Sequence, residues 1–143
     1  MLCYGRKVLA KAEDIRDRVQ LLEGLLPGAV LPRRKYDIII SNSLLHHLGN
    51  PQVLWDAVKH YAEQGAPVFI MDLTRPATQE EARLLIEAYA REEPQILKHD
   101  FYFSLLAAFE VNEIAKQLNQ AGMSYLSIKI VSDRHVVMAG NFA

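Results

Sequence analysis

The sequence predicts an α/β protein built on a mostly parallel sheet, and three features indicate this class. Two short continuous apolar runs, Ile38–Ile40 and Val68–Met71, are typical of strands covered on both faces by helices. A helical pattern of apolar residues lies between them, as in a strand–helix–strand unit. The chain ends in a predicted hairpin, in which an alternating run over 125–131 precedes a continuous apolar run over 136–139.

The composition is that of one globular domain. The chain has 143 residues, of which 50% are apolar and 23% are charged. Its net charge of −1 gives no electrostatic reason to expect binding to nucleic acid or to an anionic membrane. Cys3 is the single cysteine, so we expect neither an internal disulfide nor a thiolate metal site. With no signal peptide or membrane-length apolar run in view, we expect a cytoplasmic protein.

The first third of the chain predicts a helix and a short strand. Residues 1–12 indicate a helix that starts without a capping residue, and this favours a chain whose upstream part is absent. Residues 18–24 predict a short strand that is ended by Gly24. Pro27-Gly28 then marks a turn.

The central stretch, residues 36–48, reads YDIIISNSLLHHL. Its apolar strand ends in the polar residues Ser41, Asn42 and Ser43, and open α/β sheets bind their ligands at the carboxyl ends of such strands. The pair His46-His47 follows, and Asn50-Pro51 is a favoured start for a helix.

Two further helices are predicted downstream of the second strand. One runs from about Gln79 to Glu92, and another from about Val111 to Gln120. The segment between them, residues 95–110, is too apolar for a solvated loop. We expect it to be helical or irregular and to pack over the carboxyl ends of the strands.

The motifs of the central stretch resemble one family. The Tyr36-Asp37 start, the apolar strand, Ser-Asn-Ser and Leu-His-His-Leu are similar to the fourth-strand motif of class I S-adenosylmethionine-dependent methyltransferases. The resemblance continues through residues 68–73, as the fifth strand, to the hairpin at 132–135, and covers the chain from about Val19 onward. The chain has no counterpart to the family's glycine-rich loop, because no two of the seven glycines form a G-x-G.

The resemblance implies a partial Rossmann-like methyltransferase sheet with a C-terminal antiparallel hairpin and helices on both faces. We expect one truncated domain over residues 1–143. In the family's numbering, its strands near 37–41, 68–72, 125–132 and 135–140 would lie in the order fourth, fifth, seventh, sixth.

The same resemblance places the cofactor S-adenosylmethionine against Ser41, Asn42, Ser43 and His47. Candidate catalytic residues are His46 and Asp72, and both have a structural alternative, namely bonding at a turn. Candidate substrate-binding residues are Arg75, Tyr102 and Phe103; an arginine here is otherwise a solvated surface group, and the aromatic residues are otherwise core. No third histidine or carboxylate has suitable metal-ligand spacing beside the histidine pair.

The predicted function is methyl transfer from S-adenosylmethionine to a small-molecule acceptor. We expect the chain alone not to bind the cofactor tightly, because the family holds it largely with its first two strands and their loops. One alternative is a non-catalytic methyltransferase-like fragment or interaction module. Another is a different nucleotide-binding α/β protein, although P-loop and G-x-G-x-x-G motifs are also absent.

The predicted strand at residues 36–41 would leave an unpaired apolar edge. Either the strand at 19–22 crosses over to pair with it, or two chains associate there as a homodimer. We expect association, because the connecting residues lack a helical pattern.

Overall fold

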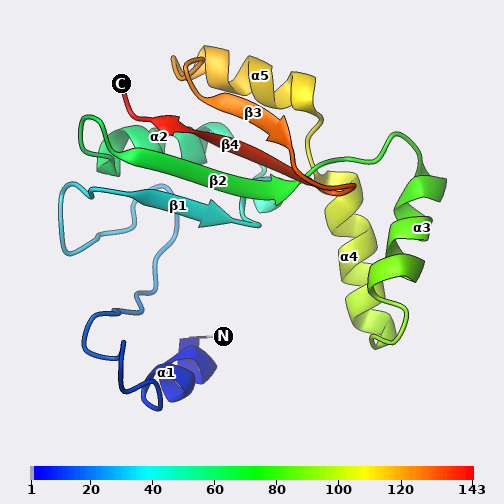
Figure 1. Cartoon of the computed structure of the whole chain (residues 1–143), viewed down its shortest axis with the longest axis horizontal. Coiled ribbons are helices and arrows are strands. Elements are labelled where there is room, and N and C mark those ends of the chain that lie inside the picture. The colour runs from blue at the N-terminus through cyan, green and yellow to red at the C-terminus, as the bar shows by residue number, and fades with distance from the viewer. Residues whose placement is uncertain (1) are drawn as a thin grey trace. The chain divides into compact units, whose positions relative to one another are not determined.

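The computed structural model describes residues 2–143 and forms two compact units, Met1–Arg34 and Lys35–Ala143 (Figure 1). The first unit contains one helix, α1 (Leu2–Leu9), shorter than the predicted helix over 1–12, whose Met1 lies outside the described residues. None of residues 2–34 is buried. The prediction of one truncated domain over residues 1–143 stays a prediction.

The predicted strand at residues 18–24 is wrong, since these residues form no strand. Val19 and Leu22 are each 41% exposed. An isolated strand has no neighbour to satisfy its backbone hydrogen bonds, so an apolar run of this length does not form one by itself.

The second unit is built on a four-stranded sheet in the order β1-β2-β4-β3, which confirms the predicted order. The strands are β1 (Ile39–Asn42), β2 (Pro67–Leu73), β3 (Ser127–Ile130) and β4 (His135–Asn141). Strand β1 pairs with β2 in parallel, and the other two pairings are antiparallel. The sheet is therefore mixed rather than mostly parallel.

The second unit, residues 35–143, contains one 3-10 helix and four α-helices, and three of the α-helices begin at capping residues. The helices are the 3-10 helix η1 (Leu45–His47), α2 (Gln52–Tyr61), α3 (Gln79–Tyr89), α4 (Gln95–Ala107) and α5 (Val111–Gln120). Asn50 Oδ1 accepts a hydrogen bond from Gln52 N at 3.1 Å, as its predicted capping role requires. Thr78 Oγ1 accepts one from Glu81 N at 3.1 Å, and Glu110 and Glu113 form a capping box before α5. No helix among residues 2–143 is both long and apolar enough to cross a membrane.

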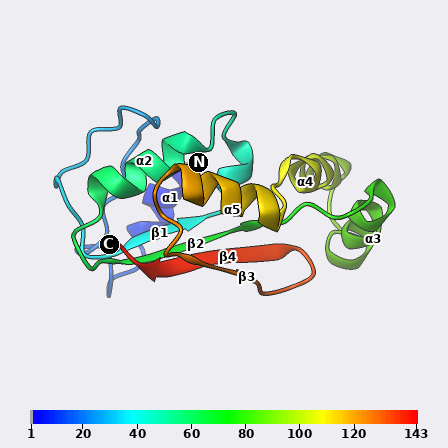
Figure 2. The same cartoon turned by 90° about the horizontal axis from the view of Figure 1, so that it is seen from above.

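Helices α2 and α5 cover one face of the sheet, as Figure 2 shows. Trp55 of α2 is fully buried, and its Nε1 donates a hydrogen bond to Gln117 Oε1 of α5 at 3.2 Å. The core between the helices and the strands is made by Leu54, Trp55, Val58, Val68, Ile70, Ile114, Leu118, Val136 and Met138.

The opposite face carries exposed apolar side chains. Ile40 is 71% exposed and Phe69 is 44% exposed, although both lie within the runs predicted to be covered on both faces. The expected covering of both faces is thus wrong for residues 35–143. The one parallel crossover, between β1 and β2, runs through α2, and α5 joins it on the same face.

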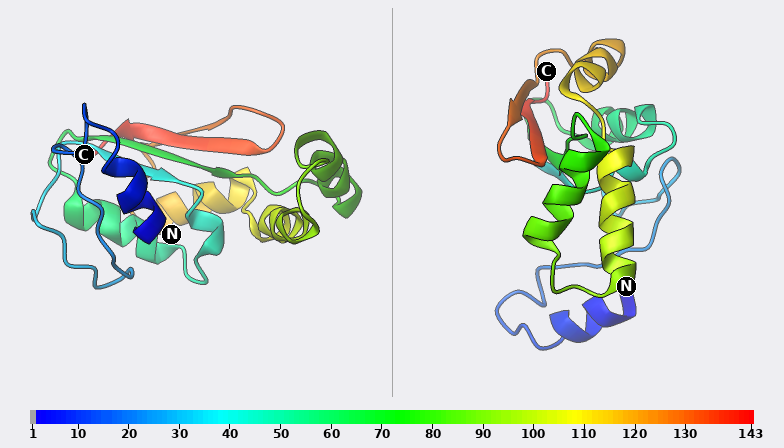
Figure 3. Two further views of the ribbon diagram at one scale, coloured as in Figure 1. Left: turned by 90° about the horizontal axis from the view of Figure 1, so that it is seen from below. Right: turned by 90° about the vertical axis from the view of Figure 1, so that its right-hand side faces the viewer.

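Helices α3 and α4 form a hairpin beyond the carboxyl ends of β1 and β2 (Figure 1; Figure 3, right). This confirms the predicted position of residues 95–110. The two helices enclose a second apolar cluster formed by Leu73, Ala82, Leu85, Leu105 and Ala108. A β-bridge between Thr74 and Phe109 joins both ends of the hairpin where it leaves the sheet.

The turn between β3 and β4 contacts helix α3. Tyr89 OH donates a hydrogen bond to Asp133 Oδ2 at 2.6 Å, and the Arg134 guanidinium lies 3.4 Å from the centre of the Tyr89 ring. The hydrogen bond from Tyr89, together with Arg134, lowers the pKa of Asp133. In the same turn, Ser132 Oγ lies 3.0 Å from His135 Nδ1. Burial, and then the positive charge of Arg134, lower the pKa of His135 below its ordinary value of 6.5.

Substituting matched isoleucines tests the one-sided core. Ile70 is fully buried, whereas Ile40, on the neighbouring strand, is mostly exposed. We expect Ile70→Ala to lower the free energy of unfolding by about 3 kcal/mol, because it leaves a cavity. Ile40→Ala should cost less than about 1 kcal/mol, since it removes a side chain from a solvated face. Urea denaturation of dilute protein measures both, and equal costs would contradict the one-sided core.

The lowered pKa of His135 predicts a pH dependence of stability. A histidine whose pKa is lower in the folded state favours the neutral ring, so its contribution is complete above about pH 6.5 and is lost as the pH falls. We expect His135→Asn to flatten the decline in melting temperature between about pH 7 and about pH 5. His99→Asn, at an exposed position, is the control and should follow the original chain. A decline that His135→Asn leaves unchanged would refute this assignment.

Candidate functional site

The turn that follows β1 holds a buried hydroxyl group. Ser41 is 9% exposed, and its Oγ has no hydrogen-bond partner among residues 2–143. Asn42, next along the strand, is exposed. Ser43 has a φ of 53°, and its backbone N donates to Met71 O at 2.9 Å. A buried hydroxyl without a partner is costly, so Ser41 Oγ keeps a free hydrogen-bonding capacity beneath this turn.

Asp72, on β2, fixes the conformation of the segment after this turn. The residue is 1% exposed. Its Oδ2 accepts a hydrogen bond from Leu45 N at 2.6 Å, and its Oδ1 accepts one from Leu73 N at 2.7 Å. One carboxylate therefore joins the beginning of η1 to the carboxyl end of β2.

The same carboxylate pairs with His46. His46 Nδ1 lies 2.5 Å from Asp72 Oδ1, and both side chains are nearly fully buried. An ionised carboxylate only accepts hydrogen bonds, so Nδ1 carries the hydrogen and a neutral ring keeps its lone pair on Nε2. His47 lies against this ring, with 3.9 Å between the ring centres. The two candidate catalytic residues are thus brought together, and their catalytic roles remain predictions.

Arg75, a candidate substrate-binding residue, is engaged at the start of α5. Its Nε donates to Ala108 O at 2.8 Å, and its guanidinium forms ion pairs with Glu113 at 2.9 Å and Glu110 at 3.5 Å. These contacts tie the end of the α4 segment to α5. Binding of a substrate by Arg75 remains a prediction, and it would have to share the guanidinium with these partners.

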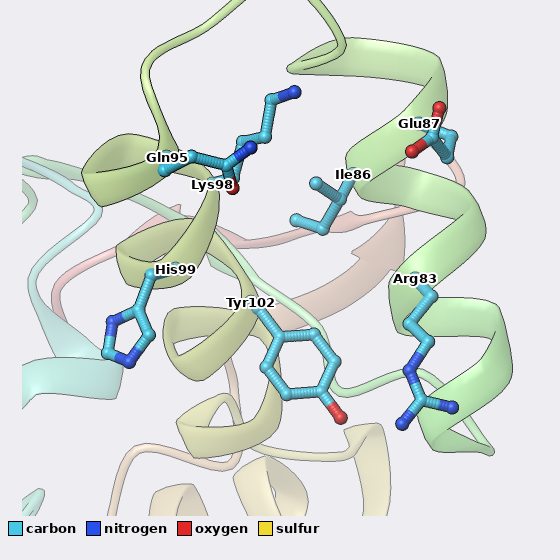
Figure 4. Close-up of a pocket in the computed structure, with 7 residues that line it drawn as sticks. All are labelled: Arg83, Ile86, Glu87, Gln95, Lys98, His99 and Tyr102. Atoms are coloured by element: carbon cyan, nitrogen blue, oxygen red, sulfur yellow. The ribbon is translucent and has the colours of Figure 1, made fainter.

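Tyr102 and Phe103 lie on helix α4. Tyr102 lines an open groove of about 470 Å³ between α3 and α4, which Figure 4 shows. Its hydroxyl donates a hydrogen bond to Gln79 Oε1 at 3.4 Å. Phe103 is 52% exposed, with its ring 4.6 Å from that of His99. The groove is therefore the surface at which Tyr102 could meet a substrate, while Phe103 packs along α4 itself.

Of the residues that line this groove, only Tyr102 was predicted from the sequence as a site residue, and two of the others are basic. Arg83 of α3 and Lys98 of α4 both line it. On their own helices they belong to ordinary charged faces, and only the pairing of α3 with α4 puts them at one groove. The sequence offered no signal for that pairing beyond the apolar residues of the two helices.

Among the comparisons with known proteins, the one with solved structures informs on the fold. No protein-family model matches the sequence, and no curated protein matches it either. Among solved structures, a SAM-dependent methyltransferase from Aquifex aeolicus has a TM-score of 0.65 at 15% identity, over 98% of this chain. A proposed O-methyltransferase from Nostoc punctiforme has a TM-score of 0.63 at 14% identity, over 97% of the chain. PigF, solved with SAH, has a TM-score of 0.61 at 14% identity, over 99%.

The chain spans 62%, 42% and 40% of the lengths of these three proteins. Identities this low inform on the fold alone. Over most of its length, the chain has the fold of class I S-adenosylmethionine-dependent methyltransferases.

Proposed function

We propose that this chain serves S-adenosylmethionine-dependent methyl transfer to a small-molecule acceptor, with the turn after β1 forming one wall of the cofactor site. Two kinds of observation support this. The fold is that of methyltransferases, one of which was solved with SAH. The polar turn lies at the carboxyl ends of two adjacent parallel strands, where such sheets bind ligands.

The observation that carries the proposal is the unpaired Ser41 hydroxyl, on the same face of the sheet as Asp72, which pairs with His46. Asn42 and Ser43 add polar groups on the same turn, and His47 adds a ring. These residues would hold the cofactor from one side. When bound, the cofactor supplies an electrophilic methyl group on a sulfonium, and transfer depends mainly on alignment with the acceptor nucleophile.

The His46–Asp72 pair has two roles consistent with its geometry. As a positioning device, Asp72 holds Leu45 N and the His46 ring, and so fixes the wall of the site. As a proton acceptor, His46 Nε2 could take the proton that an acceptor hydroxyl loses. His46 is 8% exposed, so the burial of the ring favours the positioning role.

The chain by itself offers too little surface to enclose the cofactor. Small-molecule sites bury most of their ligand, and the turn supplies one wall. The sequence has no G-x-G loop, and no strand pairs with the outer edge of β1 within residues 2–143. We therefore expect cofactor binding by this chain to be weak.

One observation favours a second candidate, a non-catalytic methyltransferase-like interaction module. The exposed apolar residues Ile38 and Ile40 of the β1 segment suit contact with another polypeptide. An interaction module would use this edge and leave the polar turn without a ligand. Binding of a cofactor analogue at the turn separates the two candidates.

Titration with S-adenosylhomocysteine, followed by NMR, tests the cofactor site. We expect the amide signals of residues 41–47 to shift, because the ligand would lie against that turn. Asn42→Ala should weaken the effect, whereas Asn119→Ala, at an exposed position on α5, should leave it unchanged. Calorimetry on the chain alone should detect no binding with a Kd in the micromolar range.

Two results would contradict these expectations. A micromolar Kd by calorimetry would show that one wall is sufficient for tight binding. Unshifted signals at 41–47 with saturating analogue would reject the cofactor site and leave the interaction module.

The anchoring role of Asp72 predicts graded losses of stability. Asp72→Ala leaves Leu45 N, Leu73 N and His46 Nδ1 without their acceptor, so we expect a loss of about 3 kcal/mol or more. Asp72→Asn keeps one acceptor oxygen and should cost about half as much. Asp100→Ala, at an exposed position on α4, is the control and should cost less than about 0.5 kcal/mol. Urea denaturation followed by circular dichroism measures all three, and an Asp72→Ala loss no larger than the control would contradict the anchor.

A further inference from the structure

The two outer edges of the sheet differ in chemistry. The edges are β1 and β3. On β3, Ile128 packs on the core, so the alternating residues Ser127 and Lys129 face the open side of the sheet. A lysine on an edge strand is a common protection against pairing with another chain. The β3 edge therefore has such protection.

The β1 edge lacks the protection that a charged side chain gives. Ile38 is 57% exposed and Ile40 is 71% exposed, and residues 38–43 contain no charged side chain. Within residues 2–143, no strand pairs with the outer side of β1. An uncharged apolar edge of this kind recruits a further strand.

The backbone of β1 is also open to pairing. Ser43 N donates to Met71 O of β2, so the backbone groups of Ser41 and Ile39 point toward β2 by alternation. The N–H and C=O groups of Ile40 and Asn42 therefore point away from the sheet. The segment at 18–24, the alternative partner within the chain, forms no strand.

We infer that a second copy of this chain pairs with the β1 edge, in antiparallel register about Ile39. The segment is self-complementary about that residue, because Ile38 of one copy then faces Ile40 of the other. Such pairs place the outward backbone groups of Ile40 in hydrogen-bonding positions. Asp37 lies in a bend before the paired residues, and Ile38–Ile40 carry no charge, so no like charges meet. A register centred on Asp37 would instead oppose two carboxylates.

The resulting dimer is a two-fold symmetric, edge-to-edge joining of two four-stranded sheets. Because the strands run antiparallel across the symmetry axis, the two polar turns lie at opposite ends of the joined sheet. The contact is short and adds few buried side chains, so we expect a reversible dimer rather than an obligate one.

Light scattering across a dilution series tests the inference. The original chain should approach twice its mass of 16.2 kDa at high concentration and fall toward a monomer on dilution. Ile40→Lys should remain a monomer, because it adds a charge to the paired edge without disturbing a buried residue. Ile130→Lys is the matched control on β3, where the isoleucine is 64% exposed, and it should still dimerise.

Amide exchange gives a second measure. The Ile40 amide should exchange more slowly in concentrated than in dilute protein, and this difference should vanish in Ile40→Lys. If circular dichroism shows that Ile40→Lys is unfolded, Ile38→Lys replaces it. A monomer at every concentration would overturn the inference. So would a dimer that survives both the Ile40→Lys and the Ile38→Lys substitution, or one that Ile130→Lys alone abolishes.

Discussion

The carboxylate of Asp72 is the constraint on which the candidate site depends. It is buried and accepts hydrogen bonds from two backbone amides, those of Leu45 and Leu73, and it pairs with His46. A buried carboxylate is stable only with such partners, and a turn with free amides needs an acceptor of this kind. The same hydrogen bonds satisfy both the buried carboxylate and the backbone amides. The end of β2 thereby determines where the backbone goes after β1, and so where Ser41 and its neighbours present their polar groups.

Polar contacts also hold the α3–α4 hairpin at the end of the sheet. Arg75 joins the residues after α4 to α5 through Ala108 O and Glu113, and Tyr89 joins α3 to the β3–β4 turn through Asp133. The apolar cluster between the two helices is small, and five buried residues form it. The hairpin is thus placed by directional contacts at its two ends more than by a large core. Tyr102 lies on the wall of the groove between the two helices.

The sequence predicted the parts of the fold that local pattern determines. Helix α5 begins and ends as expected, because its capping box and apolar spacing agree. The sequence could not predict which faces of Ile38–Ile40 are covered, since a continuous apolar run looks the same whether helices cover one face of the sheet or both. The predicted strand at residues 18–24 is wrong for a related reason. A strand needs a neighbouring strand to pair with, and the local pattern does not reveal one. His46 and Asp72 were each proposed, yet their contact arises from adjacent strands joined by a crossover.

Strand β1 separates two kinds of interaction along a few residues. Ile40 of β1 and Ile38 just before it are apolar and exposed, and the last part of the strand, from Ser41 onward, is polar and lies at the carboxyl end. Pairing with a second copy through the outward backbone groups uses the edge of the sheet, whereas a ligand at the turn uses its end. The side chain of Ser41 points to the covered face, away from the exposed face of Ile40. Pairing along the edge uses the backbone of β1, whereas a ligand at the turn would use the side chains of Ser41, Asn42 and Ser43, so substitutions at Ile40 and at Asn42 test the two properties separately.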